Sequence, residues 1–276
     1  MKRSSRVRVC ATTTVGVLAL TLITGCGGDD SGESKKSKES GGSATTQADE
    51  PAKAAKAATK AELEKLLVTK ADVTGYKVES ATAEMKAVGT KSNVKVTEPA
   101  CAPIVYAISG MAPGDEAPVV QGKVTQNLDP EAKAKAKGKG SDAGWQDAFA
   151  ESMNIDMTFL SLSSYEGDGA EKTMKAVADA VAACSGGFSA TVGSERTKYE
   201  KVAPVKPSGF GDESVAFSVK GAAEEPDDPT GFTYGEVVRH GNTIAAYTTV
   251  NLGKVVSGEP YAVSAPVVKA QSAKLK

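Results

Sequence analysis

Side chains suited to covalent or acid–base chemistry are few in this chain: four cysteines and one histidine among 276 residues. They are Cys10, Cys26, Cys101, Cys184 and His240. A thiol can be acylated, oxidised to a disulfide or bound to a metal, and a histidine can act as a general base. The sequence contains no Gly-x-Ser-x-Gly, His-Glu-x-x-His, Walker or dinucleotide-binding motif. These residues predict a protein that is modified and cross-linked but is not an enzyme, and no cofactor is expected.

Cys26 ends a segment with the layout of an export signal. Four basic residues between Lys2 and Arg8 precede an apolar run from Val9 to Ile23. That run is about 15 residues long, whereas a membrane span needs roughly 20. Ile23-Thr24-Gly25-Cys26 resembles a bacterial lipobox, in which the cysteine is acylated, for example with palmitate, and becomes the new N-terminus. An ordinary signal peptide with a chance cysteine is the alternative.

We therefore expect residues 1–25 to be a lipoprotein signal peptide and Cys26 to be the lipidation site. The protein is then expected on the extracytoplasmic face of the cell membrane, anchored by lipid. No Arg-Arg pair occurs in the basic start, which favours general secretion over the twin-arginine route.

Charge limits the expected partners. Removing residues 1–25, which carry four Lys or Arg and no acidic residue, changes the formal net charge from −1 to −5. A mildly acidic chain lacks the basic surplus of nucleic-acid-binding proteins, and no polybasic run for anionic lipid is evident. The expected partners are membrane lipid through the acyl anchor and an unknown small molecule or envelope protein, with no nucleic acid.

Cys101 and Cys184 are the two cysteines left once Cys10 leaves with the signal and Cys26 carries lipid. In an oxidising compartment they are expected to form one disulfide. The bond would close a loop of about 84 residues, which chain-entropy arithmetic values at up to roughly 4–5 kcal/mol. A metal site is not expected, because neither cysteine has a histidine at ligand spacing.

Composition divides the rest of the chain into two parts. Residues 26–58 comprise the lipidated cysteine and a stretch rich in Gly, Ser, Lys and Ala, which predicts a disordered tether with a reach of about 30 Å. Residues 59–276 are long enough for one extracytoplasmic domain with a sizeable core. Mixed helical and strand patterns predict an α+β fold, with a mainly antiparallel sheet and packed helices.

The individual elements follow from capping signals and hydrophobic periodicity. Helices are expected after Thr59, whose spacing to Glu62 fits a capping box, and at 101–108, 168–184 and 262–275. Strands are expected at 76–80, 118–126, 155–162, 214–220, 232–239 and 243–252. His240-Gly241-Asn242 predicts a hairpin turn, so His240 is interpreted as a turn residue and not as a general base.

Three further segments allow more than one interpretation. The lysine-rich stretch 128–144 is expected to be a solvated loop, with a nucleic-acid or membrane contact as the alternative. The acidic stretch 224–229 is expected to be a solvated turn, with calcium binding as the alternative. Trp145 and Phe149 lie four residues apart, and they are either a core-facing helical pair or the rim of a ligand site.

Several short sequence blocks follow one another along the chain in a recognisable order. They are Leu66-Leu67, Ala71-Asp72-Val73, Gly75-Tyr76, the Cys101 segment, Leu162-Ser163-Ser164-Tyr165, Ala182-Ala183-Cys184, Gly211-Asp212-Glu213, Val237 to Asn242, and Ala270 to Leu275. This order resembles actinobacterial lipoproteins with a PknH-like extracellular sensor domain. The resemblance implies an α+β domain with a ligand-binding cleft and no catalysis, and the chain departs from it in having one disulfide instead of two.

Three functions remain open at this stage. The leading expectation is a non-enzymatic ligand-binding or sensor domain, which a deep cleft with converging polar groups would favour. A protein-interaction or structural role in the cell envelope would show a broad exposed apolar patch. A hydrolase would need two close carboxylates of unequal pKa.

Replacing the acylated thiol tests the anchor. We expect Cys26→Ala to leave the protein unprocessed or released from lipid, because a methyl group cannot accept an acyl chain. Detergent-phase partitioning and the intact mass of the mature protein measure this. A wild-type mass without added acyl chains would contradict the expectation.

Overall fold

The computed structural model describes residues 56–81, 90–128, 153–223 and 231–276, all within the compact unit Pro51–Lys276. The strands are β1 (Tyr76–Ser80), β2 (Val94–Val96), β3 (Val119–Gln126), β4 (Met157–Ser164), β5 (Phe188–Val192), β6 (Glu195–Val205), β7 (Glu213–Gly221), β8 (Phe232–His240) and β9 (Thr243–Val250). The helices are α1 (Lys60–Leu66), α3 (Ala102–Ile108), α6 (Gly169–Ala183), α7 (Leu252–Ser257) and α8 (Ala265–Lys274), with short 3₁₀ turns η1 (Lys91–Asn93) and η2 (Pro99–Cys101).

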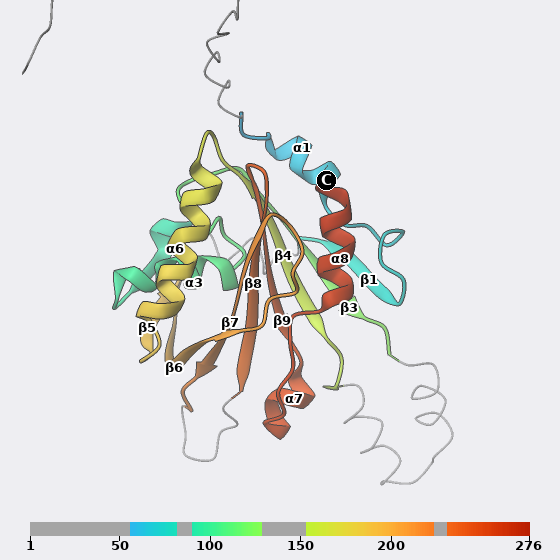
Figure 1. Cartoon of the computed structure of the whole chain (residues 1–276). Helices are drawn as coiled ribbons and strands as arrows, with labels where there is room; N and C mark the ends of the chain where they lie inside the picture. The colour runs from blue at the N-terminus through green and yellow to red at the C-terminus, as the bar shows by residue number, and fades with distance from the viewer. Residues whose placement is uncertain (1–55, 82–89, 129–152, 224–230) are drawn as a thin grey trace, which may run out of the picture. The chain divides into compact units, whose positions relative to one another are not determined.

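The strands form a single nine-stranded sheet in the order β1-β3-β4-β9-β8-β7-β6-β5-β2. Every neighbouring pair is antiparallel, so the predicted α+β class with a mainly antiparallel sheet is confirmed. Figure 1 shows α3 and α6 on one side of the sheet and α1 and α8 on the other. Among the described residues, no helix has the length and hydropathy to span a membrane.

The inner strand β9 contributes to a core on each face of the sheet. Ile244 and Ala246 belong to the core under α3 and α6, whereas Ala245 and Tyr247 belong to the core under α1 and α8. Side chains alternate between the two faces of a strand, so both sets are buried at once. We call the face under α3 and α6 the back face and the face under α8 the front face.

The two front-face helices are held together by one buried amide. The predicted capping box of α1 is present, since Thr59 accepts a hydrogen bond from the Glu62 amide and Glu62 accepts one from the Thr59 amide. At the other end of α1, Gln271 of α8 accepts from Val68 N and donates to Leu66 O, both at 2.8 Å. These two bonds satisfy backbone groups that the end of α1 would otherwise leave unpaired.

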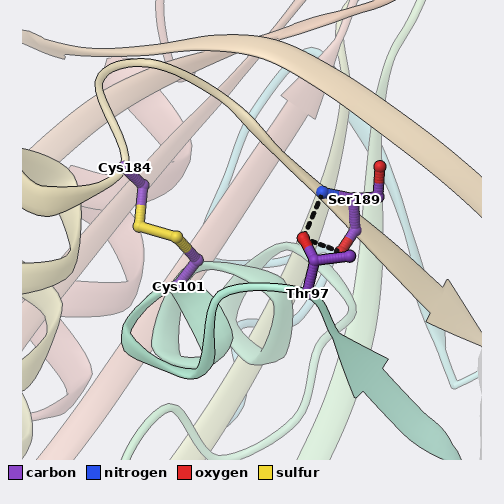
Figure 2. The surroundings of a disulfide bond; sticks show 4 residues. All are labelled: Thr97, Cys101, Cys184 and Ser189. Carbon is purple, nitrogen blue, oxygen red and sulfur yellow. Dashed lines mark hydrogen bonds between the residues drawn. A yellow bond between two sulfur atoms is a disulfide. The ribbon is translucent and has the colours of Figure 1, made fainter. Parts of the chain in front are cut away.

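The predicted disulfide between Cys101 and Cys184 is confirmed. It joins the end of η2 to the C-cap of α6, with the two Cα atoms 5.9 Å apart (Figure 2). Both cysteines are buried in the back-face core. Nearby, the Thr97 hydroxyl accepts a hydrogen bond from Ser189 N at 3.0 Å and donates one to Ser189 O at 3.2 Å, which extends the short β2–β5 pairing (Figure 2).

A buried carboxylate fixes the connection between β6 and β7 across the front face. Glu236 of β8 is only 3% exposed, and its Oε1 accepts hydrogen bonds from Ser208 N at 2.9 Å and Ser208 Oγ at 2.6 Å. Burying an ionised side chain is costly unless such donors satisfy it. Ser208 therefore fixes its loop over the middle of the sheet.

The sequence-based elements differ from the structure at three places. The three-residue strand β2 was not predicted. β5 and β6 were not predicted, because exposed charged residues and Pro204 hide the hydrophobic alternation of β6. The strand expected at 243–252 ends at Val250, where Asn251 caps a helix, α7, that was also not predicted.

Removing the disulfide tests its contribution to stability. We expect the double variant Cys101→Ala, Cys184→Ala to lose about 4 kcal/mol of unfolding free energy, because the sequence separation of 83 residues makes the closed loop long. Equilibrium urea unfolding measures the loss. Wild-type protein under reducing conditions serves as the control and should behave like the variant, whereas a loss below about 1 kcal/mol would contradict the expectation.

Candidate functional site

A candidate binding site lies beside α7, at the end of the sheet where β9 stops. Asn251 is the N-cap of this helix, and its Oδ1 accepts from Lys254 N at 3.1 Å. Its Nδ2 donates to Asp156 Oδ1 at 2.9 Å, which ties the helix to the residue just before β4. Gly258 ends the helix in the left-handed conformation, with φ 72°, which glycine adopts without strain. Two polar contacts and one glycine therefore position this short helix.

The pocket beside α7 has a volume of about 400 Å³. Small-molecule sites in proteins commonly measure about 300–1,000 Å³. One wall approaches α7 closely, since a Cβ added at Gly253 would lie 3.1 Å from both N and Cα of Asn154. The lining consists of Gly253, Lys254, Val256 and Ser257 on α7, Met153 and Asn154 opposite, and Glu259 after the helix.

Two apolar side chains are exposed at this helix. Leu252 is 41% exposed and Val256 is 61% exposed. Within the described part of the chain, these two are the exposed large hydrophobic residues. Residues four apart lie on the same face of a helix, so the two side chains form one small apolar surface. Val256 also lines the pocket, which makes this surface continuous with the cavity.

Aromatic residues fix the segment that returns from α7 to α8. The Tyr261 ring lies 4.4 Å from that of Tyr234, and its hydroxyl donates to the carbonyl of Phe232. Burial is the main cause that raises the pKa of Tyr261, to about 12. Tyr261 therefore stays protonated and can keep donating this bond at neutral pH. These contacts hold the segment after α7 against β8.

The chemistry of the lining suits binding. The Ser257 hydroxyl donates to the Lys254 carbonyl of its own helix at 3.5 Å. Lys254 and Glu259 supply one charge of each sign at the rim. Within the described ranges, no group of three or more His, Cys, Asp or Glu side chains could hold a metal ion. The pocket thus offers apolar contact and a few polar groups.

A second hollow lies between α1 and the strands β1 and β3. It consists of two cavities of about 280 and 370 Å³ that share Glu64, Leu67 and Ser80. Its lining is mostly apolar and includes four charged residues, Lys60, Glu64, Lys70 and Glu79. Of the residues described, no large hydrophobic side chain is exposed at its rim. We regard the α7 pocket as the better candidate.

The predicted site residues have different outcomes. Trp145, Phe149 and Cys26 lie outside the described residues. Cys101 and Cys184 form the buried disulfide, away from the α7 pocket. The residues of the pocket itself were missed, and the available signals were Asn251 as a cap and Gly258 as a stop.

His240 ends β8, directly before the tight turn that the sequence predicted. Its Nε2 lies 3.2 Å from Ser272 Oγ on α8. Burial is the main cause that lowers the pKa of His240, and the charge of Asp212 partly opposes that effect. Asp212 Oδ2 instead accepts a hydrogen bond from Gly241 N at 2.6 Å. The histidine therefore joins the hairpin to α8.

Comparisons with known proteins found matches among solved structures alone. No family model matches the chain, and no curated protein matches it. Among solved structures, the chain is similar to the extracellular domain of PknH from Mycobacterium tuberculosis, at 12% sequence identity and a TM-score of 0.44. The similarity covers 80% of this chain and 95% of that one. The sequence blocks described above also resembled a PknH-like extracellular domain. No residue role is transferred from that structure to this chain.

Acid should weaken the contact between the hairpin and α8. Because the pKa of His240 in the folded protein lies below its ordinary value of 6.5, the unfolded chain binds the proton first as pH falls. We expect unfolding free energy to decrease from pH 7.5 towards pH 5.5, and less steeply in His240→Gln. Urea unfolding at several pH values measures this slope.

The carboxyl groups affect stability in a lower pH range than His240, so the two effects can be separated. The lowered pKa values of Asp72 and Glu79 affect stability only below their ordinary values of 3.8 and 4.5, so the slope above pH 5 is diagnostic of the histidine. Equal slopes for the wild type and His240→Gln between pH 7.5 and 5.5 would contradict the assignment.

Proposed function

We propose that the chain is a membrane-anchored extracytoplasmic lipoprotein whose domain binds a small, largely apolar molecule in the α7 pocket without transforming it. The observation that carries the proposal is a pocket of about 400 Å³ whose wall includes Val256, a valine that is 61% exposed. Exposed apolar surface is costly in water, so its burial by a ligand is favourable. The lipid anchor rests on the lipobox-like sequence that ends at Cys26.

The position of the pocket suits a ligand that approaches from outside the membrane. Before α1, the chain is held at the β8–β9 turn, where Asn242 Nδ2 donates to Lys56 O at 2.7 Å. Ala58 N donates to Ser164 Oγ at 2.9 Å at the same end of the sheet. β9 runs from that turn to α7 over eight residues, or roughly 27 Å at 3.4 Å per residue. The pocket therefore opens at the end of the sheet far from the proposed attachment.

A protein-interaction role has less support. The exposed apolar surface on α7 comprises two side chains, Leu252 and Val256. Stable protein interfaces bury about 800 Å² on each partner, far more than two side chains supply. A small molecule matches the observed surface better.

Binding can be tested with an apolar fluorescent probe, N-phenyl-1-naphthylamine, titrated into the full chain. We expect saturable binding that weakens at least tenfold in Val256→Glu, because the variant places a charge in the wall of the pocket. Val256→Leu should keep the affinity within about twofold, since it stays apolar. Ala182→Glu places the same charge on an exposed part of α6 and is the matched control.

Native mass spectrometry of the purified protein should identify a co-purified molecule that Val256→Glu no longer retains. Recovery of that molecule at unchanged mass supports binding without chemistry. Equal probe affinity in wild type, Val256→Glu and Ala182→Glu would contradict the assigned pocket. A ligand released in altered form would favour the hydrolase interpretation.

A further inference from the structure

Half of the front face of the sheet has no described helix over it. The pairs Phe188–Tyr199 and Val202–Val219 mark the back face of β5, β6 and β7, because they pack in the core beneath α3 and α6. Residues at the alternate positions must point to the front. Most of these positions on β2, β5 and β6 are exposed or half-buried.

Positive charges gather on this uncovered half. The strand registers place five basic residues on the front of three strands, β2, β6 and β7, which lie within a run of four adjacent strands. We call them the basic face: Lys95 on β2, Arg196, Lys198 and Lys201 on β6, and Lys220 on β7. All are exposed except Lys220, which is half-buried. No run of basic residues reveals this in the sequence, because β2, β6 and β7 are far apart along the chain.

The charges are only partly balanced. Lys201 lies directly opposite Lys220 in the β6–β7 register, an arrangement that repels when nothing compensates it. Glu200, at the irregularity in that register, pairs with Lys220 at 2.8 Å. The hydrogen bond and charge of Lys220 lower the pKa of Glu200, with a smaller contribution from Lys198. Within the described ranges, the other four cations of the basic face make no ion pair.

The strands of the basic face present no aromatic ring to the front. On β5, β6 and β7 the rings of Phe188, Tyr199 and Phe217 all belong to the back-face core. Single-stranded nucleic acids are held by stacking of bases on aromatic side chains, together with charge. The nearest ring on the front is that of Phe232 on β8, opposite Lys220, and it is half-buried beside the ring of Tyr234. A surface with many cations and so little ring area for stacking suits a linear anion with no bases. Arg196 and Lys198 lie about 7 Å apart along β6. Lys220 lies opposite Lys201 on the next strand, about 5 Å away, and Lys95 lies in line with Arg196 two strands away, at about 10 Å.

We propose that the basic face binds a linear phosphate polymer that carries no nucleobases. The β5–β6 hairpin lies at the same end of the sheet as α7, because Lys220 pairs with Phe232 at the start of β8. The cations thus lie at the end far from where the chain is held before α1. If the lipid anchor of the proposed function holds, this position favours a polymer beyond the membrane over the anchoring membrane itself.

The test uses fluorescein-labelled linear polyphosphate and anisotropy with the full chain, so that the acidic residues 224–228 are present in every measurement. We expect binding that weakens with salt, as counterion release requires. Lys198→Glu with Lys201→Glu should weaken binding at least tenfold at low salt. The slope of log affinity against log salt should fall by roughly one to two. Lys65→Glu with Lys269→Glu makes the same charge change on exposed positions of α1 and α8, and should leave binding within about threefold.

Two further measurements distinguish polymer binding at the basic face from attraction to a lipid surface and from binding at the α7 pocket. Co-sedimentation with vesicles of phosphatidylglycerol, using Cys26→Ala to exclude the anchor, should show weak binding that is equal in both double variants. Vesicle binding that only the basic-face variant loses, or equal polyphosphate affinity in the two double variants, would overturn the proposal. Val256→Glu should leave polyphosphate binding unchanged, so the failure of the α7 pocket and the failure of the basic face are distinguishable.

Discussion

The rest of the structure depends on the burial of β8 and β9 on both faces of the sheet. Val237 and Ile244 must be covered at the back while Val238 and Ala245 are covered at the front. One antiparallel hairpin therefore requires two separate layers of cover, one drawn from the middle of the domain and one from its two ends. α3 and α6 supply the back layer, and α1 and α8 supply the front layer. The disulfide and the Gln271 amide each join the two helices of one layer.

The helices do not cover the whole sheet, and the two proposed binding surfaces lie where the helices end. On the front, α8 and the loop fixed by Glu236 cover the centre, and β5 and β6 continue beyond them. The side chains on the front of β5 and β6 contact water instead of a core, so most of them are polar or charged. At the end of β9 the sheet also runs out, and α7 turns back with Leu252 and Val256 facing solvent. Both surfaces follow from the limit of the helical cover.

Prediction from sequence succeeded where a local pattern and burial agree. The capping box of α1, the apolar stripe of α6 that ends at Cys184, and the β8–β9 turn each carry their own signal. β6 carries none, because five of its first six residues are exposed and the pairing that makes it a strand comes from β5 and β7. The α7 pocket was missed for a similar reason. Its wall exists only because Gly253 approaches Asn154, a contact between segments far apart in the chain.

The strand order also has a consequence for the time course of folding. A chain emerges from its N-terminus during synthesis, and domains form as their partners become available. β4 lies between β3 and β9, so one of its edges stays unpaired until the chain has been made through Val250. The helix that shields the front of this region, α8, comes later still. The first half of the domain is therefore held open until β9 has been made, so the sheet closes late in synthesis. Long-range pairing of this kind also makes closure slow, so the edge of β4 that β9 will cover stays exposed for a long interval.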